Sequence, residues 1–115
     1  MPPRDWRQRI EDIVEALERI RTYTEGTTFD SFASDQRTVD AVIRNIILIG
    51  EAARHVPDNV QGRYPHIPWA DMRAMRNLVA HQYFAVDLAI VWDTIHQDIA
   101  ALVPDLQDIL GRELD

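Results

Sequence analysis

Three side chains between residues 75 and 84 could act together on a phosphate ester. Arg76 carries a permanent positive charge on a planar guanidinium that suits bidentate phosphate binding. His81 is the type of side chain best able to exchange protons near pH 7, and Tyr83 adds a phenolic hydroxyl. The sequence shows no Ser-His-Asp or Cys-His arrangement, and its Asp residues have no metal-ligand spacing. The set therefore indicates phosphodiester chemistry without a metal or cofactor.

RNA fits this set because its ribose 2′-hydroxyl can act as the nucleophile. His81 would move the proton, a contribution of about 10² to 10⁴ in rate. Arg76 would stabilise charge that builds on the phosphoryl oxygens, and Tyr83 would orient the phosphate or stack on a base. One histidine cannot easily serve as acid and base on opposite sides of phosphorus. Two copies facing each other would supply both, so we predict a homodimer.

The spacing of the three residues leaves a second interpretation open. Arg76 and Tyr83 would lie on nearly the same face of an ideal helix, whereas His81 would lie off that line. The three meet only if the helix ends or distorts near Ala80, or if a second chain completes the site. Alternatively, Arg76 and His81 only face the negative end of a helix dipole.

Length and composition predict one globular domain that spans residues 1–115. The chain has 115 residues, of which 46% are hydrophobic, and this is enough for one core. The absence of cysteine excludes disulfides, thiolate nucleophiles and Cys-ligated metals, and it fits a reducing compartment. The longest apolar run, residues 46–50, is far too short to cross a bilayer, and the first residues form no apolar signal region. We therefore expect a soluble, cytoplasmic protein with no membrane partner.

The net charge of −7 argues against a broad surface that coats nucleic acid. All 12 basic residues are arginine, so each positive site could clamp a phosphate. A polyanion must therefore bind locally, in a cleft, against the field of the whole protein.

Apolar periodicity predicts an all-α bundle of four to five helices, largely up-and-down. The first helix is expected over residues 4–24 and is stopped by Gly26. Residues 26–34 are expected to form a loop whose two phenylalanines pack against the bundle. Ser34 or Asp35 is expected to cap a second helix that reaches about Val56.

The second half of the chain is expected to hold a connector and two more helical segments. The connector covers residues 59–67 with one short turn, and Pro68 opens the next helix. The last segment begins near Asp87 and should kink or restart between Ala101 and Pro104. Three histidines are expected at the surface: His55, His66 and His96.

Two charged residues in the second helix are of special interest. Arg44 and Glu51 lie seven residues apart, on one face of a segment that is apolar on more than one side. Such a segment must be covered by the bundle or by a second subunit. The two charges form a solvated or mutually paired face, or Glu51 reaches Arg76 and orients it.

Residues 76–83, Arg-Asn-Leu-Val-Ala-His-Gln-Tyr, resemble the Arg-x4-His-x-Tyr motif of HEPN-domain ribonuclease toxins of the HepT-like family. Gly-Glu-Ala at 50–52, Ile-Pro-Trp at 67–69 and Arg-Asp-Trp at 4–6 also match the pattern of that family. Length and helical order agree as well. The similarity extends from Arg4 to about Leu110.

The resemblance implies a toxin of a prokaryotic toxin–antitoxin system. Such proteins form dimers whose paired motifs line a cleft that cleaves RNA without metal. In this chain the catalytic residues would be Arg76, His81 and Tyr83, with Asn77 and Glu51 in support. The implied partner is a minimal nucleotidyltransferase antitoxin, which transfers AMP from ATP onto Tyr83, in a homodimer or a larger complex with the antitoxin. The acidic surface makes a local feature of tRNA the expected target.

Two other functions remain open. The chain could be a non-catalytic helical partner that presents nucleotide or substrate to a nucleotidyltransferase. It could also be a helical protein in which Arg76 and His81 only close a helix end. RNA cleavage separates the first hypothesis from both.

Overall fold

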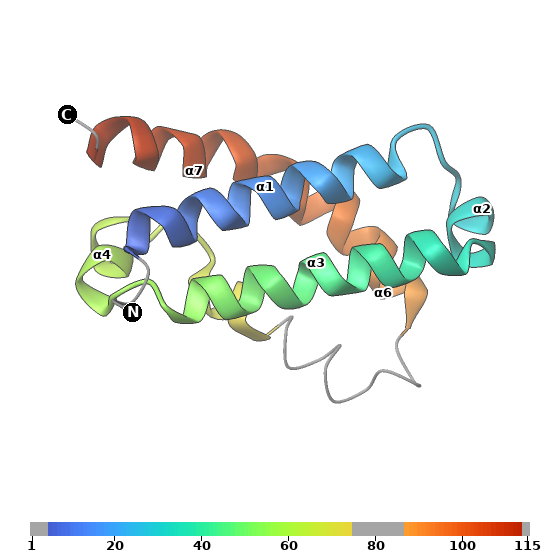
Figure 1. The fold of residues 1–115 in the computed structure, drawn as a ribbon, viewed down its shortest axis with the longest axis horizontal. Helices are drawn as coiled ribbons and strands as arrows, with labels where there is room; N and C mark the ends of the chain where they lie inside the picture. The colour runs from blue at the N-terminus through green and yellow to red at the C-terminus, as the bar shows by residue number, and fades with distance from the viewer. Residues whose placement is uncertain (1–4, 75–86, 114–115) are drawn as a thin grey trace.

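The computed structural model describes residues 5–74 and 87–113, and these residues form helices and connections without a strand. The all-α prediction is confirmed (Figure 1). The elements are α1 (Trp6–Thr24), α2 (Phe29–Ser34), α3 (Gln36–Arg54), α4 (Asp58–Arg63), α6 (Leu88–Thr94), the π-helix η2 (Ile95–Ile99) and α7 (Ala100–Glu113). Residues 69–74 are also helical.

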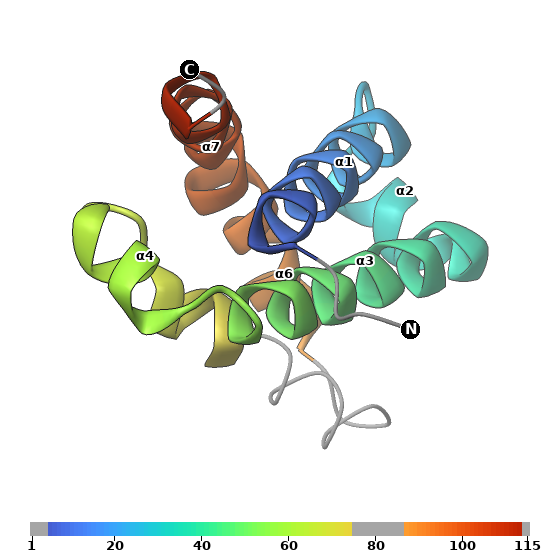
Figure 2. The same ribbon diagram turned by 60° about the vertical axis from the view of Figure 1, so that its left-hand side comes forward.

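The long helices α1 and α3 lie side by side and run in opposite directions (Figure 1). α7 packs on α1, and α2 lies at the turn between α1 and α3. Figure 2 shows α4 at one end of this arrangement, near the beginning of α1. The predicted apolar stripes form the shared core, in which Leu17, Ile49 and Leu106 are fully buried.

The ends of α1 and α3 agree with the predicted signals to within two residues. Asp5 accepts a hydrogen bond from the Arg7 amide at 2.9 Å and so begins α1. Gly26 follows α1 with a φ of 75°, a conformation that glycine adopts without strain. Asp35 caps α3, as predicted.

The cap at Asp35 should make the protein less stable as the pH falls into the acid range. Hydrogen bonds from Thr38, first from its hydroxyl and then from its amide, hold the pKa of this carboxyl below its ordinary value. Because the folded pKa is lowered, the stabilisation is complete above the unfolded pKa of 3.8 and is lost as pH falls through the folded pKa. We expect Asp35→Ala to lower the melting temperature by a few degrees at pH 7. Asp35→Asn, which keeps one of the two acceptor oxygens, should melt between the alanine variant and the wild type there and lose this part of the acid dependence. Thermal melts between pH 2 and 7 test both, and an unchanged alanine variant would refute the assignment.

The predicted loop over residues 26–34 is wrong, because residues 29–34 form α2. Thr28 accepts a hydrogen bond from the Ser31 amide at 3.1 Å, and the Ser31 hydroxyl accepts one from the Thr28 amide at 3.0 Å. This capping box stabilises a helix of one and a half turns in a sequence with weak helix formers. The expected packing holds for Phe32, which is fully buried, whereas Phe29 remains 37% exposed.

The predicted restart of the helix between Ala101 and Pro104 is also wrong. α7 continues through Pro104, and the irregularity lies earlier, in the π-turns of η2. Proline removes a backbone donor and crowds the carbonyl four residues before it, which here belongs to Ala100. The wider turns of η2 lie directly before Ala100, and the chain changes direction there (Figure 1).

The remaining predictions concern the connector and the surface. The predicted short turn is α4, which begins at Asp58, slightly earlier than expected. His55, His66 and His96 are exposed, as predicted. Within residues 5–74 and 87–113, none of the helices has the length and hydropathy needed to span a membrane.

Candidate functional site

The predicted catalytic residues lie outside the part of the chain that the structure describes. Arg76, Asn77, His81 and Tyr83 all fall between residues 75 and 86, so their grouping stays a prediction. The structure does describe both flanks of this segment and the face of α3 that carries Glu51. These parts show how the chain is held on either side of the motif.

Before the motif, the helical residues 69–74 are anchored to the core. Trp69 is 5% exposed and its indole Nε1 donates to the carbonyl of Tyr64 at 3.0 Å. The amide of Met72 donates to the carbonyl of Pro68 at 3.0 Å, which confirms that Pro68 opens this helix. Arg73 donates to the side chain of Gln61 at 2.8 Å. Packing and hydrogen bonds therefore fix the chain up to Arg73, three residues before Arg76.

After the motif, α6 is anchored in a similar way. Asp87 accepts a hydrogen bond from the Ala89 amide at 2.9 Å and so caps α6. One and a half turns later, Trp92 packs on the ring of Phe32, with centroids 5.4 Å apart. Trp69 and Trp92 thus anchor the described helices that precede and follow the motif segment.

Glu51 lies on α3 at a half-buried position, with 33% of its side chain exposed. Its carboxylate is 3.9 Å from the guanidinium of Arg54, one turn further along the helix. The predicted contact between Glu51 and Arg76 involves a residue outside the described part, so it stays a prediction.

Glu51 also lines a groove between α1 and α3, which we call the α1–α3 groove. It consists of two adjoining hollows of about 470 and 420 Å³ that share Arg19 and Leu48. The first hollow is lined by Arg19, Tyr23, Asp40, Ala41, Arg44, Asn45 and Leu48. The second is lined by Arg9, Asp12, Glu15, Arg19, Leu48, Glu51 and Ala52.

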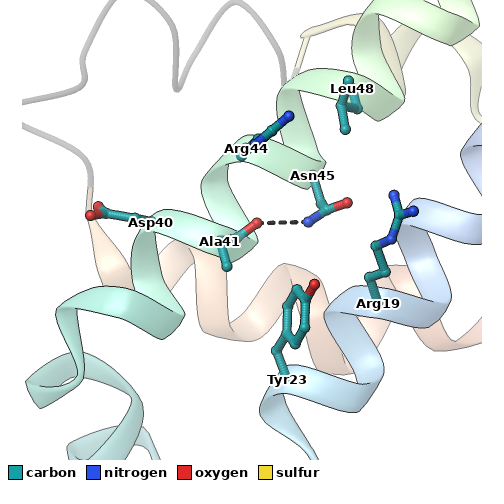
Figure 3. A pocket seen from close by; sticks show the side chains of 7 residues that line it. All are labelled: Arg19, Tyr23, Asp40, Ala41, Arg44, Asn45 and Leu48. Atoms are coloured by element: carbon teal, nitrogen blue, oxygen red, sulfur yellow. Dashed lines mark hydrogen bonds between the residues drawn. The ribbon is translucent and has the colours of Figure 1, made fainter.

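The first hollow brings together polar groups from two helices. Figure 3 shows Arg19 and Tyr23 rising from α1 toward Asn45 and Leu48 of α3. Asn45 is 5% exposed and its amide nitrogen donates to the carbonyl of Ala41 at 2.8 Å (Figure 3). Its amide oxygen has no hydrogen-bond partner among the described residues.

Sequence reasoning missed Arg19, Tyr23 and Asn45 as groove residues. An asparagine within an apolar helical run was a usable signal, because a buried amide needs partners. The pairing of α1 with α3, which brings Arg19 and Tyr23 to the same place, was not readable from either helix alone. No group of three metal-ligating side chains occurs within residues 5–74 and 87–113.

The family model described as "Ribonuclease HepT-like" matches residues 13–112, which is most of the chain. The helical fold and this match define the class: the chain belongs to the HepT-like ribonuclease family. The matched range contains all the predicted catalytic residues. Membership places the chain among the ribonucleases, with RNA as the class of substrate.

Individual relatives agree with this assignment over nearly their full lengths. The chain is 39% identical, over 86% of its length and 90% of the relative, to "Probable ribonuclease HepT" of Thermococcus cleftensis. It is 34% identical, over 96% of its length and 91% of the relative, to a protein of Methanocaldococcus jannaschii whose name also describes an RNase. A protein of Caldanaerobacter subterraneus whose name also describes an RNase is 30% identical, over 93% of the length of this chain and 96% of the length of the relative. No solved structure matches the chain.

Proposed function

We propose that this protein is the metal-independent endoribonuclease toxin of a prokaryotic toxin–antitoxin system. The observation that carries the proposal is the family match over residues 13–112, which contains the Arg76–Tyr83 motif. We further propose that the chain is a single domain that acts in the cytoplasm, where tRNA is present. The net charge of −7 favours a local feature of tRNA over long RNA, because the field of the protein opposes extended polyanions.

The proposed reaction takes place between two copies of the chain. The ribose 2′-hydroxyl attacks the adjacent phosphorus, and the bond from phosphorus to the 5′ oxygen breaks. His81 of one copy takes the proton of the 2′-hydroxyl, and His81 of the other gives a proton to the leaving 5′ oxygen. Arg76 stabilises the charge on the phosphoryl oxygens, and Tyr83 orients the phosphate. The products carry a 2′,3′-cyclic phosphate and a 5′-hydroxyl.

Two further residues support this site in the proposal. Asn77 is adjacent to Arg76 in the sequence and can contact the phosphate through its amide. Glu51 forms an ion pair with the Arg76 guanidinium and so orients it. This matters because a planar guanidinium must be held in position to present its N–H donors to phosphate.

Purified protein should cleave tRNA into discrete fragments in the presence of excess chelator. The expected result follows because none of the proposed steps uses a metal ion. Gel electrophoresis of end-labelled tRNA measures it, with added Mg²⁺ as the comparison. Cleavage that appears only with Mg²⁺ would contradict metal independence. Intact tRNA under both conditions would favour the non-catalytic partner described above.

Control by a nucleotidyltransferase antitoxin is the second part of the proposal. In the proposed transfer, the Tyr83 hydroxyl attacks the α-phosphorus of ATP, pyrophosphate leaves and the phenolic proton is lost to solvent. The product adds a negative phosphodiester and an adenosine where RNA phosphate must bind, so cleavage should stop. The toxin dimer would meet the antitoxin in a larger complex.

Incubation with the cognate nucleotidyltransferase and ATP should add AMP to the wild type and not to Tyr83→Phe. Tyr23→Phe is the matched control, because it removes the hydroxyl of a tyrosine that is 41% exposed and lies outside the motif, so it should leave the modification intact. Intact-protein mass spectrometry measures the addition. AMP on the Tyr83→Phe variant in the amount seen for the wild type would show that another residue is the acceptor.

A further inference from the structure

The α1–α3 groove contains large apolar side chains that are exposed to solvent. Among the described residues, four large apolar side chains are exposed, and two of them, Tyr23 at 41% and Leu48 at 42%, line this groove. Phe29 instead contacts Trp92, and Ile90 lies on α6. An exposed leucine at the centre of a hollowed, charged surface is typical of a surface that another molecule covers.

The charges around Leu48 differ between the two hollows. The first hollow has more cations than carboxylates, because Arg19 and Arg44 face one Asp40. The second has more carboxylates than cations, with Asp12, Glu15 and Glu51 against Arg9 and Arg19. Because Leu48 lines both hollows, it marks the boundary between a basic and an acidic half.

The order of charges along α3, with Arg44 before Leu48 and Glu51 after it, lets two antiparallel copies of the helix pair opposite charges. Arg44 precedes Leu48 by four residues, or about 6 Å along the helix, and Glu51 follows it by three, or about 4.5 Å. If two α3 helices cross in opposite directions at Leu48, Arg44 of each copy meets Glu51 of the other to within about 1.5 Å along the axis. A two-fold axis repeats each such contact, so the basic half of one groove covers the acidic half of the next.

We propose that the α1–α3 groove is the surface through which two copies of this chain pair, with the two-fold axis close to Leu48. The pairing buries Leu48 and Tyr23 and sets Arg44 against the partner's Glu51 twice. It names an interface for the homodimer of the proposed function, but it does not depend on RNA cleavage. A strand of RNA fits the groove less well, because carboxylates outnumber cations in its second half.

Charge reversal at one position should weaken the dimer, and reversal at both should restore it. Arg44→Glu and Glu51→Arg each place like charges opposite one another at two symmetric contacts. We expect each single variant to raise the dissociation constant of the dimer at least about tenfold. The double variant Arg44→Glu/Glu51→Arg should return toward the wild type. Sedimentation equilibrium measures the constants, and circular dichroism checks that each variant remains helical.

A mixture of the two single variants gives a sharper test. In a heterodimer of Arg44→Glu with Glu51→Arg, both symmetric contacts become attractive again. Native mass spectrometry should therefore show more heterodimer than the random half of all dimers. Arg37→Glu and Glu11→Arg are the control variants. Arg37 is exposed on α3 and Glu11 is exposed on α1, the two helices that form the groove, and neither residue lines it. Their mixture should pair at random.

Three outcomes would overturn the proposal. A wild type that stays monomeric at all concentrations has no such interface. If neither single variant changes the dissociation constant of the dimer and the mixture pairs at random, the dimer forms through another face. If Arg44→Glu weakens RNA binding and leaves the dimer unchanged, the groove binds nucleic acid. A dimer that responds as expected but leaves tRNA intact would overturn the proposed ribonuclease activity and leave this interface standing.

Discussion

His81→Ala should lower the rate of tRNA cleavage by about 10² to 10⁴, the usual contribution of a positioned acid or base. The loss should fall at the upper end of that range, because each site would use two copies of the residue, one as base and one as acid. The rate constant should be measured under single-turnover conditions with excess protein, so that product release does not mask the chemical step.

His55→Ala is the control for this prediction, because His55 is exposed at the end of α3, away from the motif segment in the sequence. It should cleave at the rate of the wild type. Equal rates for His81→Ala and the wild type would show that the roles assigned to the motif are wrong. Equal losses in both variants would point to a general effect of removing a histidine.

Phe32→Ala should lower the free energy of unfolding by about 3–5 kcal/mol, as is usual for the loss of a buried phenylalanine. Phe32 is fully buried, and its ring centroid lies 5.4 Å from that of Trp92. The change would leave a cavity where α2 meets α6, which neighbouring side chains cannot fill without moving. Since small domains are stable by only about 5–15 kcal/mol, this loss should be visible in urea.

Phe29→Ala provides the comparison within the same short helix. Phe29 is 37% exposed and contacts Trp92 edge-on, with ring centroids 6.1 Å apart. Its loss should cost about 1–2 kcal/mol, because 37% of the residue stays in water on folding and its removal leaves no closed cavity. Similar midpoints for the two variants would mean that α2 does not depend on the buried ring, in conflict with the packing described here.

The long helices could be predicted because two independent signals agree in each. In α3, the apolar periodicity and the cap at Asp35 indicate the same boundary. The short helix α2 was missed because its apolar residues, Phe29 and Phe32, are too few to show a period. Its capping box was the usable signal, with serine in place of the usual acidic or amide partner at Ser31.

The position of the helix irregularity was predicted wrongly for a physical reason. Proline marks where a helix loses a hydrogen bond, but the chain can absorb the misfit in the preceding turns. Here π-turns occur in η2 before Ala100, and α7 runs through Pro104 as one helix. The sequence shows that Pro104 removes a hydrogen bond from the helix, but it does not show where along the helix an irregular turn occurs.

The class of reaction could be predicted from the motif, whereas the roles of the motif residues stay predictions and the surroundings of the site could not be foreseen. The types and spacing of Arg76, His81 and Tyr83 already indicate phosphodiester cleavage, and the family match agrees with that class of reaction. The α1–α3 groove was not predictable, since it depends on which faces of two antiparallel helices remain uncovered. Arg44 and Glu51 were noted as sharing one face, but the exposed Leu48 between them appears only in the folded chain.

The chemical nature of the fragment ends tests the central claim most directly. Fragments made from tRNA by the wild type in excess chelator should end in 2′,3′-cyclic phosphate and begin with a 5′-hydroxyl, which mass spectrometry of the fragments identifies. Those ends follow only from attack by the neighbouring 2′-hydroxyl. Fragments with a 3′-hydroxyl and a 5′-phosphate would instead mean that water attacks phosphorus, and the mechanism assigned to Arg76, His81 and Tyr83 would be contradicted.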